Sequence, residues 1–238
     1  MRTVQIEGLT VRLVGGSDRE GGGNGPLVVL LHGYGAPGDD LVPLQRVLNV
    51  PREVRFAFPA APLELPELAA YGGRAWWPID VLAMQRAAAR DRTRETPPGL
   101  AAARDIVIGL LEGLSRELQV PSESMILGGF SQGAMLSCDV ALRTALPLAG
   151  LILLSTTLLC RDEWQPLMAA RASLPVLQTH GLQDPLLPYE AAVELRELWR
   201  AAGVNVDWLE FLGAHELPHG VLEAMGKFIR RSSAATEA

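Results

Sequence analysis

The stretch GGFSQGA (residues 128–134) decides the fold of this chain. It follows the run SMIL (124–127) and precedes the largely apolar run 135–142, so the expected order is strand, tight turn, helix, with Gly-x-Ser-x-Gly at the junction. A nucleophilic serine that stands clear of a sheet needs such a turn, because side chains two positions away on either side would keep strand and helix apart. We therefore interpret Ser131 as a nucleophile; the alternative is a glycine-rich turn with an incidental serine.

Composition indicates one globular domain that spans residues 1–238. Hydrophobic residues make up 48% of the chain and the mean hydropathy is +0.17, which is enough for a large core. The net charge of −6 argues against nucleic acid as a partner, because binding phosphates requires a basic face. The sequence has no apolar stretch of membrane-spanning length and no signal-peptide pattern near its first residue. We expect a cytoplasmic protein without stable membrane insertion.

Apolar runs alternate with amphipathic segments along the chain. Strands are expected at 27–31, 54–58, 124–129, 148–155, 175–179 and 206–212, with one or two edge strands within 4–14. Helices are expected near 40–48 and at 99–118, 132–145, 161–172, 189–202 and 221–230. Most of these strands are apolar throughout, which is typical of a parallel sheet covered on both faces. The predicted fold class is α/β, with a mostly parallel central sheet and helices on both faces.

Residues 59–98 interrupt this alternation with many prolines and glycines. A stretch of this length without periodicity inside a compact domain is usually functional or disordered. We expect residues 63–98 to form a lid or a groove-forming insertion, with a helix over 81–94.

A serine nucleophile needs a base to take its proton and a carboxylate to hold the base in the correct tautomer. In open α/β sheets these groups lie beyond the carboxyl ends of the strands, in the chain order Ser, acid, His. Of the four histidines, His32 and His180 directly follow earlier strands, and we interpret them as loop braces. His215 lies three residues past the strand at 206–212 and is preferred to His219 as the base, because it is nearer to the strand end.

Asp184 is the predicted acid, since it lies just past the strand at 175–179. Asp162 also follows a strand and stays as an alternative, whereas Asp207 lies inside a strand, where it would be poorly placed. Cys138 and Cys160 do not have the spacing of metal ligands, and we expect no metal.

Two backbone amides are predicted to form an oxyanion hole. Gln132 opens the helix after the nucleophile, so its N–H points toward the place where an oxyanion would form. Tyr34 supplies the second N–H from the loop after the strand at 27–31, in which three glycines allow the amides to turn inward. This loop lacks the Gly-Lys-Ser/Thr and Gly-x-Gly-x-x-Gly patterns of phosphate-binding loops.

With these residues in place, the chain resembles the phospholipase/carboxylesterase family of α/β-hydrolases, which includes the acyl-protein thioesterases. The resemblance is carried by LLHGYG (30–35), ILGGFSQGA (126–134), THG (179–181) with Asp184, and GAHE (213–216). WWPID (76–80) is similar to a tryptophan-containing segment that lines the substrate groove of that family. This similarity implies that Trp76 and Trp77 offer apolar walls to a substrate groove; packing in the core is the alternative. Ala134 departs from the second glycine that the family often has at this position. The resemblance implies hydrolysis of carboxylic esters or thioesters without a cofactor.

The prediction is a serine carboxylesterase that acts on a small-molecule ester or thioester through an acyl-enzyme intermediate. Ser131 would attack the acyl carbonyl, His215 would act as base and then as acid, and Asp184 would orient the imidazole. One alternative is an acyl-protein thioesterase or lysophospholipase that acts on long acyl chains. A remoter alternative is a non-catalytic binding protein on a hydrolase scaffold. An apolar groove rim leaves a homodimer possible.

Overall fold

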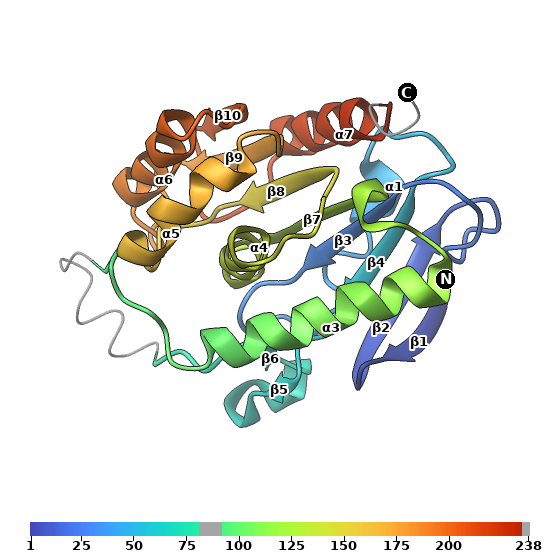
Figure 1. Cartoon of the computed structure of the whole chain (residues 1–238). Helices are drawn as coiled ribbons and strands as arrows, with labels where there is room; N and C mark the ends of the chain where they lie inside the picture. Colours follow the sequence, from blue (N-terminus) through green and yellow to red (C-terminus); the bar gives the residue numbers. More distant parts are fainter. Residues whose placement is uncertain (81–91, 235–238) are drawn as a thin grey trace.

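An eight-stranded sheet lies at the centre of the computed structural model, which describes residues 1–80 and 92–234 (Figure 1). The strands are β1 (Arg2–Ile6), β2 (Leu9–Gly15), β3 (Leu27–Leu31), β4 (Arg55–Pro59), β7 (Met125–Phe130), β8 (Gly150–Leu154), β9 (Val176–Gly181) and β10 (Val206–Phe211). Their order in the sheet is β1-β2-β4-β3-β7-β8-β9-β10. The pairings β1–β2 and β2–β4 are antiparallel and the other five are parallel. The predicted mostly parallel sheet is confirmed.

Helices cover both faces of this sheet (Figure 1). The helices are α1 (Leu44–Val47), α3 (Leu100–Leu118), α4 (Gln132–Arg143), α5 (Arg161–Met168), α6 (Tyr189–Ala201) and α7 (His219–Ala234). Short 3-10 turns add η1 (Pro66–Tyr71), η2 (Ser122–Ser124) and η3 (Ala169–Arg171), and β5 (Leu63–Glu64) pairs with β6 (Arg74–Ala75) in a separate two-stranded sheet. Apolar residues of α3, α4, α5 and α6 pack in one core, and those of α7 pack in the other.

The strands themselves divide the core between the two faces. In β3, Leu27, Val29 and Leu31 pack on the face of α3 and α4, whereas Val28 and Leu30 pack on the face of α7. Successive side chains of a strand point to opposite faces, so a strand covered on both sides is apolar at every position. This explains why continuous apolar runs located the central strands in the sequence.

A buried carboxylate fixes α4 to the helices beside it. The side chain of Asp139 is fully buried. It accepts hydrogen bonds from Arg104 on α3 at 3.0 Å, from Arg143 at 2.8 Å and from the indole N–H of Trp164 on α5 at 2.8 Å. A buried charge needs this number of partners to offset its lost hydration. The contacts hold α4, the helix that follows Ser131.

Some expected boundaries differ from those observed. The helix expected near 40–48 shortens to the single turn α1, which begins after Pro43. The last helix begins two residues before the expected 221 and continues to Ala234, because Ser232 and Ser233 in its last turn are still buried. The short β5–β6 sheet was not predicted, because two-residue strands carry no periodic pattern. The helix expected at 81–94 lies largely outside the described residues.

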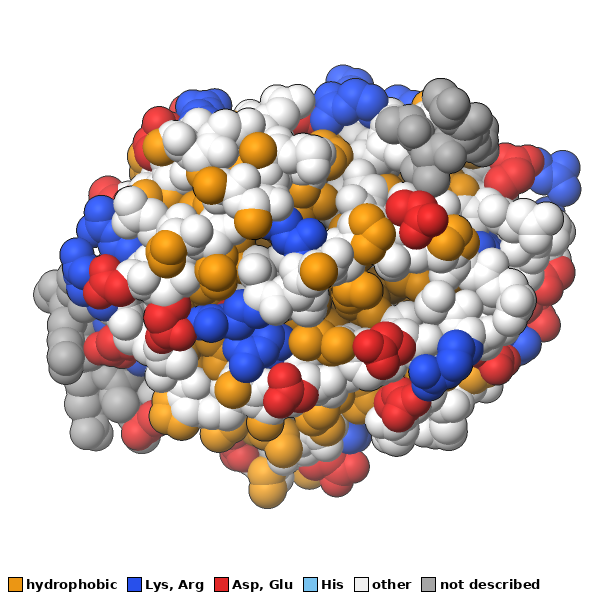
Figure 2. All heavy atoms as spheres, in the orientation of Figure 1, with side chains coloured by type: hydrophobic (Ala, Val, Ile, Leu, Met, Phe, Trp, Pro, Cys, Tyr) orange, Lys and Arg blue, Asp and Glu red, His pale blue; other side chains and the backbone are white. Residues whose placement is uncertain are grey.

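Charged side chains of both signs are interspersed over the face that carries α3 and α4 (Figure 2). The described residues of this face therefore form no single-sign basic surface of the kind that phosphate binding requires. Among the helices of residues 1–80 and 92–234, none combines the length and the apolar character needed to cross a membrane.

Candidate active site

Ser131 occupies the turn between β7 and α4 in a backbone conformation that is rare outside glycine, with φ 55° and ψ −117°. Its N–H donates a hydrogen bond to the carbonyl of Leu154 at 2.9 Å, at the carboxyl end of β8. Its carbonyl accepts from the amides of Ala134 and Met135, which begin the helix. The turn therefore presents Ser131 at the carboxyl edge of the sheet, where it is half-buried.

The glycines on either side of Ser131 are required by close backbone contacts. A Cβ atom at Gly129 would lie 2.5 Å from the carbonyl carbon of Gly133 and 2.6 Å from the carbonyl oxygen of Leu31. A Cβ atom at Gly133 would lie 2.1 Å from the same oxygen. Because β3, β7 and α4 meet here without space for a side chain, the Gly-x-Ser-x-Gly pattern is a steric requirement of the junction.

A short hydrogen bond joins the predicted base to the predicted acid. Nδ1 of His215 lies 2.6 Å from Oδ2 of Asp184, whose side chain is fully buried. The imidazole lies beside Phe130, with ring centroids 4.7 Å apart, and Phe130 directly precedes Ser131. The structure thus brings Asp184, His215 and the Ser131 turn together at one edge of the sheet.

Asp184 is held by the backbone of its own loop as well. Its Oδ1 accepts hydrogen bonds from the amides of Leu186 at 2.8 Å and Leu187 at 3.0 Å. Burial would raise the pKa of Asp184, but the hydrogen bonds from His215 and from these two amides outweigh it and lower the pKa below the ordinary value. The carboxylate is therefore charged at neutral pH, as a partner of an imidazole must be.

The alternatives considered for base and acid lie elsewhere. His219 is exposed at the start of α7 and lies 3.3 Å from Glu223. Asp162 pairs with Arg94 and Asp207 pairs with Arg231. Each of these side chains contacts another side chain at the surface and not the turn of Ser131.

The loop after β3 lies against Ser131, as an oxyanion loop would. A Cβ atom at Gly33 would be 3.4 Å from the Cβ of Ser131. Within the described part of the chain, the amides of Tyr34 and Gln132 donate no hydrogen bond, so both remain available to an oxyanion. The placement fits the predicted pair of donors.

His32 braces this loop through both of its ring nitrogens. Its Nδ1–H donates to the carbonyl of Gly33 at 2.8 Å, and its Nε2 accepts from the amide of Ala61 at 2.9 Å. Burial lowers the pKa of His32 from 6.5 to about 4, so the ring is neutral at pH 7. Sequence reasoning assigned His32 the role of a brace, and the hydrogen bonds agree with it.

Comparison with known proteins identifies the family. A model of the phospholipase/carboxylesterase family matches residues 21–233. The chain belongs to the phospholipase/carboxylesterase family of α/β-hydrolases. As a member of this family, it is a carboxylic ester hydrolase.

Similar proteins cover most of the hydrolase. Acyl-protein thioesterase 1 of Neurospora crassa is 27% identical over 211 residues, which are 85% of this chain and 84% of that protein. Acyl-protein thioesterase 1 of Mycosarcoma maydis is 31% identical over 175 residues, 70% of this chain and 71% of that protein. The crystal structure of esterase PE8 has a TM-score of 0.78 at 26% identity and covers 96% of this chain and 99% of its own. The Bacillus cereus carboxylesterase has a TM-score of 0.69 at 18% identity and covers 94% of each chain, which shows the shared fold.

The side chain of Gln132 has a role in the hydrolase that sequence reasoning missed. Its Oε1 accepts from the amide of Trp76 at 2.9 Å, and its Nε2 donates to the carbonyl of Trp77 at 2.8 Å. The indole of Trp76 donates to the carbonyl of His32 at 3.0 Å. Both tryptophans are only 2% exposed and belong to the core. The structure therefore shows the core packing that was the alternative to a groove wall.

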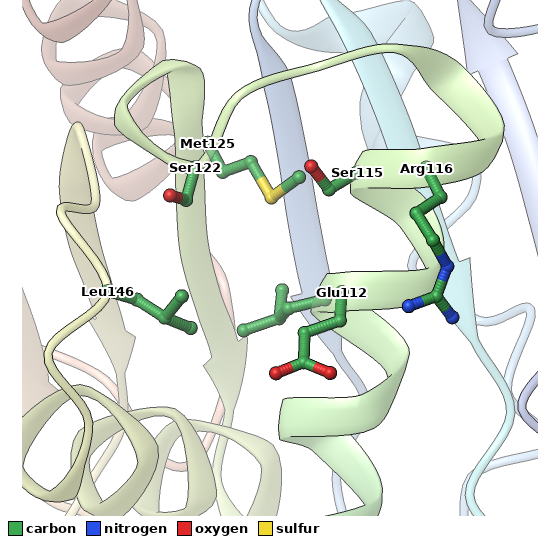
Figure 3. Close-up of a pocket in the computed structure, with 7 residues that line it drawn as sticks. Glu112, Ser115, Arg116, Ser122, Met125 and Leu146 are labelled. Atoms are coloured by element: carbon green, nitrogen blue, oxygen red, sulfur yellow. The ribbon is translucent and has the colours of Figure 1, made fainter.

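The described hollows of the hydrolase lie at the opposite edge of the sheet from Ser131. One has a volume of about 220 Å³ and is lined by residues such as Glu112, Met125 and Leu146 (Figure 3). Met125 begins β7, whereas Ser131 follows its end. A second hollow of about 640 Å³ is lined by Ala149 and Pro175, the residues before β8 and β9. Neither hollow is a candidate for the ester site.

Among the described residues of the hydrolase, no group of three or more His, Cys, Asp or Glu side chains could hold a metal ion. The imidazole of His215 and the carboxylate of Asp184 pair at the edge of the sheet that carries Ser131.

Proposed function

We propose that the chain is a serine carboxylesterase that works through a Ser131-His215-Asp184 triad and an acyl-enzyme intermediate. The observation that carries the proposal is the 2.6 Å hydrogen bond between His215 and Asp184, formed beside the strained turn of Ser131. Family membership supports the reaction class, and the placement of the three side chains supports their roles.

The proposed first step is acylation of Ser131. The hydroxyl oxygen attacks the ester carbonyl while Nε2 of His215 takes the proton. Asp184 holds Nδ1–H, which leaves Nε2 free to accept the proton and stabilises the imidazolium that forms. The amides of Tyr34 and Gln132 bind the negative oxygen of the tetrahedral intermediate. His215 then returns the proton to the leaving alcohol as the bond between carbon and oxygen breaks.

The second step is hydrolysis of the acyl-enzyme. His215 takes a proton from water, and the hydroxide adds to the acyl carbonyl. The second tetrahedral intermediate collapses, the carboxylic acid leaves, and the proton on His215 passes to the Ser131 oxygen. The cycle uses only groups of this chain and one water molecule.

Exposed apolar side chains favour a second candidate, the hydrolysis of long-chain esters or thioesters. Leu182 and Leu186 on the acid loop are 44% and 52% exposed, and Leu212 before the histidine loop is 80% exposed. The amide of Leu182 donates to the carbonyl of Phe211, which holds the two loops together. Apolar side chains on the loops that carry Asp184 and His215 would bind an extended acyl chain better than a short one. The relatives named acyl-protein thioesterase 1 support the same alternative.

Hydrolysis of p-nitrophenyl esters with acyl chains from two to twelve carbons tests the proposal. The wild type should turn over part of the series, and Ser131→Ala should reduce kcat by at least about 10³-fold. Ser122→Ala, at the opposite edge of the sheet, is the matched control and should keep wild-type kcat. A folded wild type inactive on every ester and thioester offered, or an active Ser131→Ala, would refute the proposal. The preferred chain length separates the two candidates.

A further inference from the structure

His180 is a buried imidazole that the proposed reaction does not use. It is the next-to-last residue of β9, and its side chain is fully buried. Its Nε2 lies 3.1 Å from the carbonyl oxygen of Leu187 and 3.6 Å from Oδ2 of Asp184. The first distance is that of a hydrogen bond, in which Nε2–H donates, and the second is longer than a hydrogen bond.

Leu187 connects His180 to Asp184. The carbonyl of Leu187 accepts from His180, and the amide of Leu187 donates to Oδ1 of Asp184 at 3.0 Å. The amide of Leu186 donates to the same oxygen at 2.8 Å. Oδ1 is thereby occupied by the backbone, and Oδ2 is directed to His215. One imidazole thus fixes the loop backbone that sets the rotation of the carboxylate.

We propose that His180 is a positioning residue, whose hydrogen bond to Leu187 holds Asp184 in the orientation that pairs Oδ2 with His215. The proposal rests on the triad proposed above and adds a fourth side chain to it. His180 does not touch the reacting atoms; it acts through Leu187 and Asp184.

The role requires a neutral His180. A charged imidazole 3.6 Å from Asp184 would compete with His215 for the carboxylate. The ionisable groups around the ring are Asp184, His215 and Tyr189, whose ring centroid is 6.2 Å away. Glu210 lies opposite His180 in the β9–β10 register and accepts the hydroxyl hydrogen of Tyr189. Burial outweighs the attraction of Asp184 and lowers the pKa of His180, so the ring donates to Leu187 at neutral pH without a charge.

His180→Gln and His180→Asn form a matched pair that tests the proposal. The glutamine amide reaches about as far as Nε2 of histidine and can donate to the carbonyl of Leu187, whereas the asparagine amide is one methylene shorter. We expect His180→Gln to stay within about 3-fold of wild-type kcat, and His180→Asn to lose about 10- to 100-fold with unchanged KM. In the asparagine variant, the acid limb of the pH profile of kcat/KM should also move to lower pH, because His215 loses the carboxylate that stabilises its charged form.

Gln178→Leu is the control for a purely structural effect. Gln178 is buried on the same strand and donates to the carbonyl of Ala192 at 2.7 Å, away from the acid loop. This variant should lose thermal stability and keep the wild-type kcat and pH profile. A shift of the acid limb in Gln178→Leu would show that any lost hydrogen bond on β9 has the same effect, and would overturn the proposal.

The outcomes separate this inference from the proposed function. Equal kcat values and equal pH profiles in the glutamine and asparagine variants would overturn the positioning role. An inactive Ser131→Ala in the same assays would still support the triad. An active Ser131→Ala would refute the triad itself. Loss of folding in both His180 variants would also overturn the inference, because it would make His180 a requirement of the core.

Discussion

Replacing Gly133 by alanine should damage the site without changing any group that takes part in the chemistry. The new Cβ atom would lie 2.1 Å from the carbonyl oxygen of Leu31 and 2.7 Å from that of His32. Both contacts are with backbone, so rotating a side chain cannot relieve them. Either the first turn of α4 or the loop after β3 must move by roughly 1 Å, and each carries one amide of the proposed oxyanion hole. Misplacement on this scale should cost about 100-fold in kcat/KM, and the overpacking about 1–3 kcal/mol in the free energy of unfolding.

Steady-state hydrolysis of a short-chain ester and urea unfolding measure the two effects. Gly109→Ala is the matched control, because it lies inside α3, where a Cβ atom would meet only Cγ of Glu7 at 3.8 Å. Alanine favours a helix more than glycine does, so the free energy of unfolding of this control should rise by about 0.5–1 kcal/mol, and its activity should stay at the wild-type level. Wild-type activity and stability in Gly133→Ala would refute the argument that the junction has no space for a side chain.

Three further substitutions test the roles of Asp184, His32 and Asp139. Asp184→Asn keeps the shape of the side chain but favours the wrong tautomer of His215, so steady-state kcat should fall by about 10⁴-fold; a loss under 10-fold would contradict the role. The pKa of His32 is lowered from 6.5 to about 4 in the folded chain. The unfolded chain therefore binds the proton first, and urea unfolding should show roughly 3 kcal/mol of stability lost between pH 7 and pH 4. The same pH dependence in His32→Gln would assign that loss to other groups. Asp139→Ala leaves the indole N–H of Trp164 and two arginines without their buried acceptor, so the free energy of unfolding should fall by about 3 kcal/mol; a change under 1 kcal/mol would show that water replaces the carboxylate.

The sequence predicted the central sheet because its strands are buried on both faces. The strand expected at 27–31 is β3 without any change of boundary, and the helix expected at 99–118 differs from α3 by one residue. A strand covered on both faces is apolar at every position, and an amphipathic helix is apolar at every third to fourth position. Both patterns are therefore visible in the sequence itself. The short segments near residues 63–75 carry no such signal, which is why β5, β6 and η1 were not anticipated.

The hydrogen bonds of Gln132 and His180 could be found only in the three-dimensional structure. The hydrogen bonds of Gln132 to Trp76 and Trp77 span more than 50 positions of the sequence. His180 was expected just after its strand, but β9 continues to Gly181 and carries the imidazole into the core beside Asp184. These contacts depend on which loops meet at the carboxyl edge of the sheet, and no local pattern encodes that meeting.

Covalent labelling tests the central claim, that Ser131 is the nucleophile, most directly. The folded wild type would be treated with a fluorophosphonate, and intact-mass and peptide mass spectrometry would locate the adduct. The account predicts one phosphonyl group on Ser131, loss of ester hydrolysis in proportion to labelling, and neither labelling nor hydrolysis in a folded Ser131→Ala. An adduct on another residue, or ester hydrolysis that persists in Ser131→Ala, would contradict it.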